Sequence, residues 1–309
     1  MINQNLKRVF YQFIIMSIVL FIFVELISAF LIITRIVPDR YPSYRFRNIT
    51  DNFYTPHKIF GVWHSPNSNY RRDIMTKVIC KANSYGAADI ERKKLNASSK
   101  KRILVLGDSF VEGKGVNQRH RYTNRLESHT GLEHLNFGIA DTGSTQQYLI
   151  YKHLAKHFDH DVLLIGILPN NDFLDNDLKF GKMVHSNKYR PYFVGDYPNY
   201  SLEYYNPNFS FKKYFISEYT QALFREFTFS YTAIKHLVFR SLLSLKKNHL
   251  PFDTIPTHDS DSKKRIYSGY YDFTESQFQL LTYTLEKIHT EASGIPIILV
   301  TYPSLNDLQ

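Results

Sequence analysis

The chain reads Ile103-Leu104-Val105-Leu106-Gly107-Asp108-Ser109-Phe110 at the point that decides its fold. Four consecutive apolar residues are typical of a parallel strand that is buried on both faces. The glycine that follows permits a tight exit from the strand, and an aspartate there can bond local backbone amides. Gly-Asp-Ser alone is also an ordinary turn sequence. At a strand end, however, it places the Ser109 hydroxyl where α/β enzymes carry a nucleophile.

Further apolar runs and the stretches between them indicate the rest of the fold. The strand-like runs are Ile103–Leu106, Leu135–Phe137, Val162–Leu168 and Ile295–Thr301, and the helix-compatible stretches cover residues 119–130, 145–158 and 275–291. Apolar strands that alternate with helices predict a three-layer α/β/α fold with a parallel, flavodoxin-like sheet. Residues 173–271 are less regular, and we expect them to form an insertion over the sheet edge.

Two other predicted strands also end in loops that can serve a reaction at Ser109. Leu135–Phe137 continues into Gly138-Ile139-Ala140-Asp141-Thr142-Gly143, whose backbone N–H groups can face a developing oxyanion. Val162–Leu168 continues into Pro169-Asn170-Asn171-Asp172, where Asn171 can add a side-chain donor and Asp172 can fix the loop. Each loop by itself also fits an ordinary turn. Together they predict one site, because the carboxyl ends of parallel strands meet in one crevice.

With these three motifs the chain resembles the SGNH hydrolases, also called the GDSL esterase/lipase family, and among them the membrane-anchored bacterial type. Gly107-Asp108-Ser109-Phe110 resembles the first block of the family, whose serine is the nucleophile and donates its backbone N–H to the oxyanion. Asn171-Asp172 resembles the end of the third block, whose asparagine is an oxyanion donor. The resemblance implies a serine esterase or acyl-transfer enzyme that acts on an ester-bearing small molecule, lipid or glycan.

The second block departs from the family pattern. Counting from Asn136, the position that usually holds the oxyanion glycine falls on Asp141, while Gly138 and Gly143 match neighbouring glycines. A backbone N–H is still present at Asp141, but a carboxylate close to the hole disfavours an oxyanion.

The fourth element of the family is missing from these 309 residues. Family members carry an Asp-x-x-His after the last strand, in which the histidine deprotonates the serine and the aspartate orients it. Glu286-Lys287-Ile288-His289 has the spacing but precedes the last strand, and we interpret it as a solvated helical face. If Gln309 is the true terminus, we expect little or no hydrolase activity.

Two functional hypotheses therefore remain. In the first, the chain is a fragment of an SGNH-type serine esterase, or an esterase cut by a premature stop. In the second, it is an inactive, membrane-tethered relative that binds acylated glycans or a partner. An Asp-x-x-His in the reading frame after Gln309 supports the first hypothesis, and its absence supports the second.

The N-terminal region predicts a membrane anchor. From Val9 to Thr34 the chain is almost entirely apolar, and about 20 apolar residues suffice to span a bilayer as a helix. No clean signal-peptidase site follows, so we favour an uncleaved anchor over a removed signal peptide. We expect Glu25 to be protonated or to pack against a partner. The expected organisation is an anchor at 1–36, a linker and extension at 37–100, and the hydrolase-like domain at 101–309.

Composition excludes several other classes. The formal charge is +10, but the basic residues are scattered and accompany no recognition module, so nucleic-acid binding is not expected. The single cysteine, Cys80, excludes an internal disulfide. No ligand spacing indicates a metal site, and we expect no cofactor. The family resemblance implies a single-pass membrane protein with an extracytoplasmic domain. Basic residues occur on both sides of the anchor, so the positive-inside rule is ambiguous and leans against a translocated domain.

Overall fold

The computed structural model describes residues 2–37, 41–46, 52–71, 78–184, 188–247, 269–303 and 307. The chain divides into two compact units. The first consists of Met1–Thr50 and Lys212–Ile255, and the second of Asp51–Phe211 and Pro256–Gln309. The first unit thus takes in part of the segment 173–271 that the sequence marks as an insertion. Each unit has its own core, and the two are described separately.

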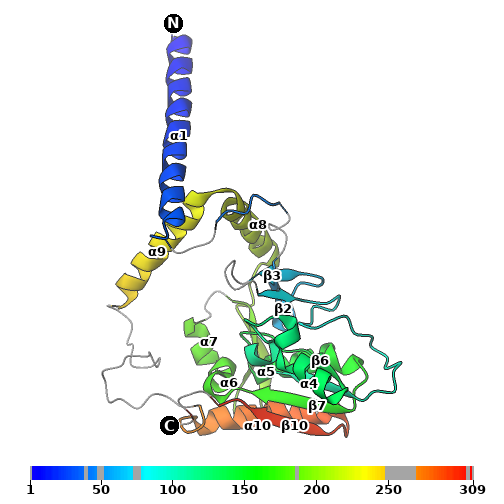
Figure 1. The fold of residues 1–309 in the computed structure, drawn as a ribbon. Coiled ribbons are helices and arrows are strands. Elements are labelled where there is room, and N and C mark those ends of the chain that lie inside the picture. The colour runs from blue at the N-terminus through cyan, green and yellow to red at the C-terminus, as the bar shows by residue number, and fades with distance from the viewer. Residues whose placement is uncertain are drawn as a thin grey trace. The chain divides into compact units, whose positions relative to one another are not determined.

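A four-stranded parallel sheet forms the centre of the second unit. Its strands are β5 (Arg102–Leu106), β6 (Glu133–Asn136), β7 (Val162–Ile167) and β10 (Ile297–Thr301), and their order is β10-β7-β5-β6 (Figure 1). This confirms the predicted parallel α/β sheet, with strand ends that differ from the prediction by one or two residues. Because β5 lies between β6 and β7, the carboxyl ends of these three strands are neighbours.

Helices cover both faces of this sheet. The core on one face joins Leu104 of β5 and Leu135 of β6 to helices α5 (Ser144–His153) and α10 (Glu275–Ala292). On the other face, the side-chain amide of Asn136 in β6 donates a hydrogen bond to the Thr123 hydroxyl of helix α4 (Tyr122–Thr130) at 3.1 Å. The three layers agree with the predicted fold class.

The helix predicted at 119–130 is divided in the structure. Arg121 is extended, with φ of −61° and ψ of 143°, and separates the 3₁₀ turn η1 (Gln118–His120) from α4. The helix predicted at 145–158 likewise ends at His153. Leu154 leaves helical geometry before a second 3₁₀ turn, η2 (Ala155–His157). A single non-helical residue interrupts the helical hydrogen bonds but does not change the spacing of the apolar residues. The sequence pattern therefore predicts one continuous helix in each case.

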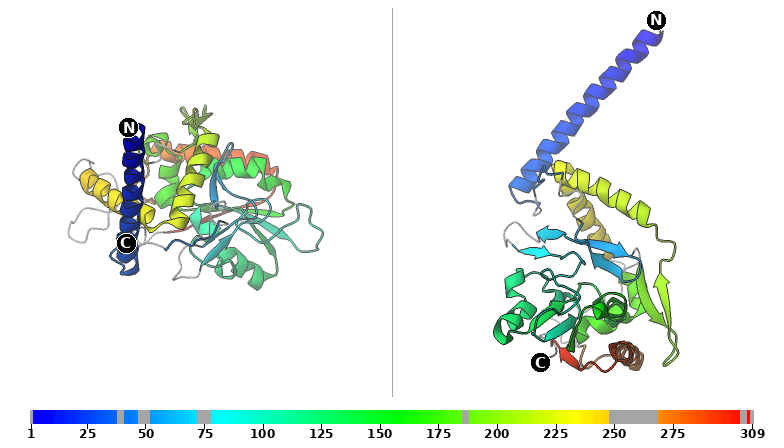
Figure 2. Two further views of the ribbon diagram at one scale, coloured as in Figure 1. Left: turned by 90° about the horizontal axis from the view of Figure 1, so that it is seen from above. Right: turned by 90° about the vertical axis from the view of Figure 1, so that its right-hand side faces the viewer.

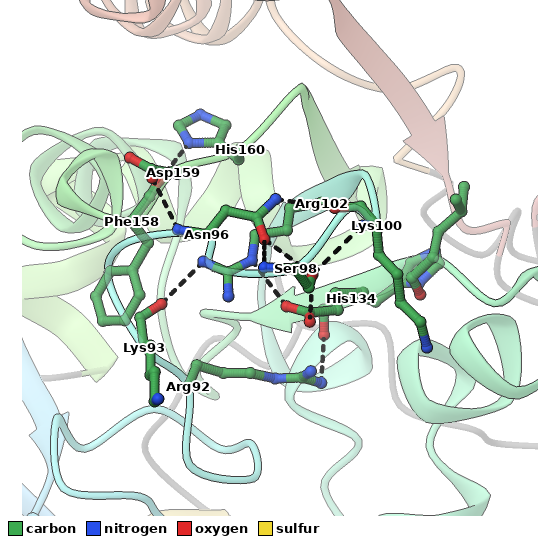
Figure 3. Close-up of polar contacts among 12 residues, drawn as sticks. Arg92, Lys93, Asn96, Ser98, Lys100, Arg102, His134, Phe158, Asp159 and His160 are labelled. Atoms are coloured by element: carbon green, nitrogen blue, oxygen red, sulfur yellow. Dashed lines mark hydrogen bonds and ion pairs between the residues drawn. The ribbon is translucent and has the colours of Figure 1, made fainter.

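Hydrogen bonds and an ion pair connect the segment before β5 to the amino ends of the strands (Figure 3). The Arg102 guanidinium donates to the Lys93 carbonyl at 2.9 Å, and its Nε donates to the Glu133 carboxylate at 2.7 Å. The backbone amide of Asn96 donates to the Asp159 carboxylate at 2.8 Å. These bonds hold the end of the sheet that lies opposite Ser109, so this part of the molecule has a structural role.

Short hairpins and helices complete the second unit. Three two-stranded antiparallel sheets pair β1 (Tyr54–His57) with β2 (Gly61–His64), β3 (Asn69–Arg71) with β4 (Ile79–Lys81), and β8 (Arg190–Val194) with β9 (Ser201–Tyr205). The short helices are α3 (Ser109–Glu112), α6 (Pro169–Asn176) and α7 (Leu178–Val184). Residues 54–81, which belong to the segment expected as linker and extension, therefore carry four of these strands.

The described part of the first unit contains the helices α1 (Ile2–Ile33), α8 (Phe211–Phe227) and α9 (Phe229–Lys247). Its buried apolar cluster contains Ile32, Val37 and Ala233. Figure 2 shows α1 as one continuous helix. The 29 residues Asn5–Ile33 are long and apolar enough to cross a membrane, as the sequence predicts.

Candidate active site

Ser109 begins helix α3 directly after the exit from β5, and its side chain is partly exposed. Gly107 makes this exit possible. A Cβ at Gly107 would lie 2.1 Å from Cγ2 of Val111, which is closer than two carbon atoms can approach. The Gly107 carbonyl accepts from the Ile139 amide at 3.1 Å, so the turn is also tied to the loop after β6. The strand-to-helix turn that the sequence predicts around Ser109 is present.

Asp108 holds the turn from within. Its side chain is fully buried, and one carboxylate oxygen accepts from the Phe110 amide at 2.9 Å, which caps α3. The other oxygen accepts from the side-chain amide of Asn171 at 3.3 Å. Burial raises the pKa of Asp108 above its ordinary value, although these hydrogen bonds oppose the rise. Asp108 therefore positions Ser109 and joins the ends of β5 and β7.

Asn171 and Asp172 occupy the first turn of α6, which follows β7. An amide nitrogen carries two hydrogens, so the bond to Asp108 uses only one donor of Asn171. Asp172 is buried, and its carboxylate accepts from the Leu168 amide at 2.7 Å, which fixes the loop as the sequence predicts. Burial, together with repulsion from Asp108, raises the pKa of Asp172 well above its ordinary value. The structure thus brings the first and third motifs into direct contact.

Asp141 adopts a backbone conformation that glycine favours. Its φ is +66°, in the left-handed region that costs a residue with a Cβ about 1 kcal/mol or more. Its carboxylate forms an ion pair with Lys188, and Nη1 of Arg190 lies 3.8 Å from the carboxylate and donates to the Asp141 carbonyl at 3.0 Å. The negative charge that we expected to disfavour an oxyanion is therefore offset by two cations.

A buried glutamate that the sequence analysis did not single out supports the same loop. Glu112 is fully buried and accepts from the Ala140 amide at 2.6 Å and from the Tyr54 hydroxyl at 2.5 Å. Nε2 of His64 lies 3.6 Å from the same carboxylate. Burial alone would raise the pKa of Glu112, but the His64 ring and these hydrogen bonds outweigh it and lower the pKa.

The only sequence signal for Glu112 is a carboxylate three residues after Ser109 on a turn that is otherwise apolar. Nothing in the sequence links it to Tyr54 and His64, because they precede it by more than 40 residues and reach it only through the β1–β2 hairpin. The tertiary structure therefore adds a brace for the loop that carries Asp141.

Aromatic side chains line the sheet beside the turn. Tyr302 follows β10 and stacks against Phe110, with ring centroids 5.7 Å apart, and Tyr122 lies 6.1 Å from Tyr302. Gly166 of β7 leaves room for this ring, since a Cβ there would lie 2.7 Å from a Tyr302 ring carbon. Burial raises the pKa of both tyrosines, so they remain neutral near neutral pH. Phe110, Tyr302 and Tyr122 thus form an aromatic wall on one side of the Ser109 turn.

Among the described residues, no histidine hydrogen-bonds to the Ser109 side chain, while Nδ1 of His64, His134 and His160 each lies within hydrogen-bonding distance of a backbone carbonyl. Glu286 and His289 are exposed on α10, in agreement with a solvated helical face. The residues that the structure brings together are thus a serine, its neighbouring aspartate and the candidate oxyanion donor Asn171.

Comparison with known proteins gives matches among solved structures. A protein from Desulfitobacterium hafniense described as lipolytic and of the G-D-S-L family matches with 14% identity and a TM-score of 0.22, over 61% of this chain and 99% of its own. A GDSL-like lipase from Bacteroides thetaiotaomicron matches with 12% identity and a TM-score of 0.22, over 64% of this chain and 92% of its own. No family model and no curated protein matches the chain.

Proposed function

We propose that the chain is an SGNH-type serine hydrolase that acts on ester bonds, with Ser109 as the nucleophile. The observation that carries the proposal is the hydrogen bond from Asn171 to Asp108, which links the third motif to the Gly-Asp-Ser turn. Ester substrates on lipids or acylated glycans fit the partly exposed serine beside the apolar Phe110–Tyr302 wall. The reaction would be hydrolysis or acyl transfer to a hydroxyl.

The proposed chemistry assigns a role to each residue. Oγ of Ser109 attacks the ester carbonyl carbon and loses its proton to a base, which leaves a tetrahedral oxyanion. The Ser109 and Asp141 backbone N–H groups and the Asn171 side chain would donate to that oxyanion. The intermediate collapses to an ester on Ser109 and releases the alcohol, which takes up the proton. Water or an acceptor hydroxyl then removes the acyl group.

The 309 residues contain no Asp-x-x-His, the motif that would supply the base for the Ser109 proton. Added imidazole can take the place of a missing histidine in solution, which makes the role of Ser109 testable. A fluorophosphonate probe reacts with an activated serine and forms a covalent adduct that can be measured on a gel.

We expect the probe to label the chain slowly and imidazole to accelerate the labelling, since the hydrogen bond from Asn171 to Asp108 supports the turn that carries Ser109. Ser109→Ala should show neither reaction. Ser144→Ala is a matched control, because Ser144 is a buried serine in α5 with side-chain partners of its own. If the wild type with imidazole labels no more than Ser109→Ala, the nucleophile assignment fails, and an inactive glycan- or partner-binding role is favoured.

We also propose that α1 anchors the chain in a membrane and that the second unit lies outside the cytoplasm. The length and apolarity of Asn5–Ile33 support the anchor. Protease added to spheroplasts that express the chain should degrade the second unit while leaving cytoplasmic proteins intact. Complete protection until the membrane is dissolved would reverse the proposed orientation.

A further inference from the structure

Helix α9 carries exposed apolar side chains on one face in the part of the first unit that the structure describes. Ile234, Leu237 and Val238 have exposed fractions of 52%, 51% and 51%. Their spacing of three and four residues puts them on one side of the helix. The sequence continues this spacing at Leu242 and Leu245. Contiguous apolar side chains of this kind mark a contact with another molecule or with a membrane.

The charge of α9 indicates which of these contacts it makes. The helix contains no aspartate or glutamate, and its basic residues are Lys235, His236, Arg240, Lys246 and Lys247. An amphipathic helix with one apolar side and only basic charges is typical of an element that lies in the interface of an anionic membrane.

The start of α9 is fastened to the candidate membrane span. The Glu25 carboxylate of α1 accepts hydrogen bonds from the Phe229 amide and, at 3.0 Å, from the Ser230 amide. Amides in the first turn of a helix have no partner within the helix, and a negative charge stabilises that end. Among apolar chains such unpaired amides would cost several kcal/mol each. This bond explains why an acidic residue interrupts an otherwise apolar segment.

The position of Glu25 sets the depth at which α9 begins. Glu25 precedes the end of α1 at Ile33 by eight residues, which corresponds to about 12 Å along a helix. The segment Asn5–Ile33 has 29 residues, more than the roughly 20 that the hydrocarbon core requires. When the roughly 20 residues of the hydrocarbon core begin at Val9, where the apolar stretch starts, Glu25 lies within about one helical turn of the boundary between acyl chains and headgroups.

From these observations we propose that α9 is a membrane-interface helix that lies beside α1. Its Ile234–Leu237–Val238 face contacts the acyl chains, the exposed Lys235 contacts anionic headgroups, and Glu25 holds its first turn. The proposal rests on the proposed anchoring of α1, and it adds a second contact between the chain and lipid.

Three exposed leucines provide matched positions for a fluorescent label. Leu237 tests α9, Leu20 in α1 tests the anchor, and Leu95 in the second unit is a control that is 75% exposed. Each is changed to cysteine in a full-length Cys80→Ala background, since Cys80 is the only native cysteine. The labelled chains are reconstituted in vesicles of phosphatidylcholine and phosphatidylglycerol and tested with spin-labelled lipid and aqueous iodide as quenchers.

We expect the spin-labelled lipid to quench the label at Leu237→Cys several-fold more than the label at Leu95→Cys, and iodide to show the reverse order. Equal quenching at these two positions, together with lipid quenching at Leu20→Cys, would overturn the proposal for α9 and leave the anchor intact. Iodide quenching at Leu20→Cys would overturn the anchor itself.

Substitutions at Glu25 test the hydrogen bonds. Glu25→Leu, which cannot accept them, should shift the label at Leu237→Cys toward iodide, whereas Glu25→Gln retains an accepting oxygen and should not. An unchanged label in Glu25→Leu would overturn the role of Glu25. Vesicles of phosphatidylcholine alone should also increase iodide quenching at Leu237→Cys, and no change there would overturn the role of the basic residues.

Discussion

The two units of this protein differ in how many of their apolar side chains are buried. In the second unit, Leu104, Val105 and Leu106 of β5 are fully buried, whereas Ile298 and Leu299 of the edge strand β10 are about half exposed. In the first unit, a small cluster around Ile32 and Ala233 is buried, while the α9 residues Leu237 and Val238 are about half exposed. The second unit therefore has the larger apolar core, and the exposed side chains of α9 fit the proposed contact of the first unit with lipid.

In both units, however, a glutamate carboxylate in apolar surroundings is stabilised by the same kind of hydrogen bond. Glu112 of the second unit and Glu25 of the first each accept hydrogen bonds from backbone amides of a segment distant in sequence. A buried carboxylate is tolerated when its oxygens are bonded, because the bonds replace those lost with water. The difference lies in what is held: Glu112 holds the loop of Asp141, and Glu25 holds the start of α9.

Replacing one leucine in each unit gives the largest expected effect. Leu104→Ala removes packing from a fully buried site and should lower the free energy of unfolding of the second unit by about 3 kcal/mol. Leu237→Ala should change it by less than about 0.5 kcal/mol. Urea unfolding followed by the fluorescence of Trp63, the single tryptophan and a core residue of the second unit, measures both. Equal losses would show that the contrast between the units is wrong.

Replacing the two glutamates sharpens the comparison. Glu112→Ala leaves the Ala140 amide and the Tyr54 hydroxyl without their acceptor, and the unfolding free energy should fall by about 2 kcal/mol. Probe labelling of Ser109 should fall as well, because the loop of Asp141 loses its support. Glu25→Ala should leave the Trp63 transition where it is. A shift of that transition by Glu25→Ala would mean that the two hydrogen-bonded glutamates are not independent.

The second unit should also show a pH dependence that originates at Asp172. Its pKa is raised in the folded state, so the folded protein binds the proton more tightly than the unfolded chain does. The stabilising effect of that proton is present below the unfolded pKa and is lost as the pH rises through the folded pKa, by about 1.4 kcal/mol for each unit of the pKa difference. Asp172→Asn removes this titration.

Urea unfolding of wild type and Asp172→Asn at a series of pH values measures this dependence. The stability of wild type should fall relative to the variant as the pH rises. Glu112 has the opposite sign, since its pKa is lowered, and its contribution is lost as the pH falls through that lowered value. A constant difference between wild type and Asp172→Asn at all pH values would contradict the assignment.

The smallest effect is expected at Asp141. Asp141→Gly relieves the strain of a φ of +66° and gives up an exposed ion pair with Lys188, so stability should rise by between 0 and about 1 kcal/mol. Asp141→Asn is the matched control, because it removes the charge and keeps a Cβ that tolerates this conformation. A clear loss of stability in Asp141→Gly, without one in Asp141→Asn, would contradict the strain at this position.

Much of the second unit follows from local sequence. Continuous apolar runs predict β5, β6, β7 and β10, with ends that differ from the observed ones by one or two residues. The spacing of apolar residues also predicts α10. The turn at Ser109 is predictable because Gly107 and Asp108 act on their own neighbours. The interruptions at Arg121 and Leu154 were missed, since a single extended residue does not change an apolar pattern.

The sequence by itself determined the parallel α/β sheet, the Gly-Asp-Ser turn at the end of β5 and the apolar N-terminal helix, because each depends on the chemistry of adjacent residues. Only the tertiary structure decided that Asn171 bonds Asp108, that Tyr54 and Glu112 support the loop of Asp141, and that Glu25 holds α9. These are contacts between residues that the chain brings together from a distance. Their physical basis, the need of a buried polar group for a partner, does not reveal in a sequence which partner it finds.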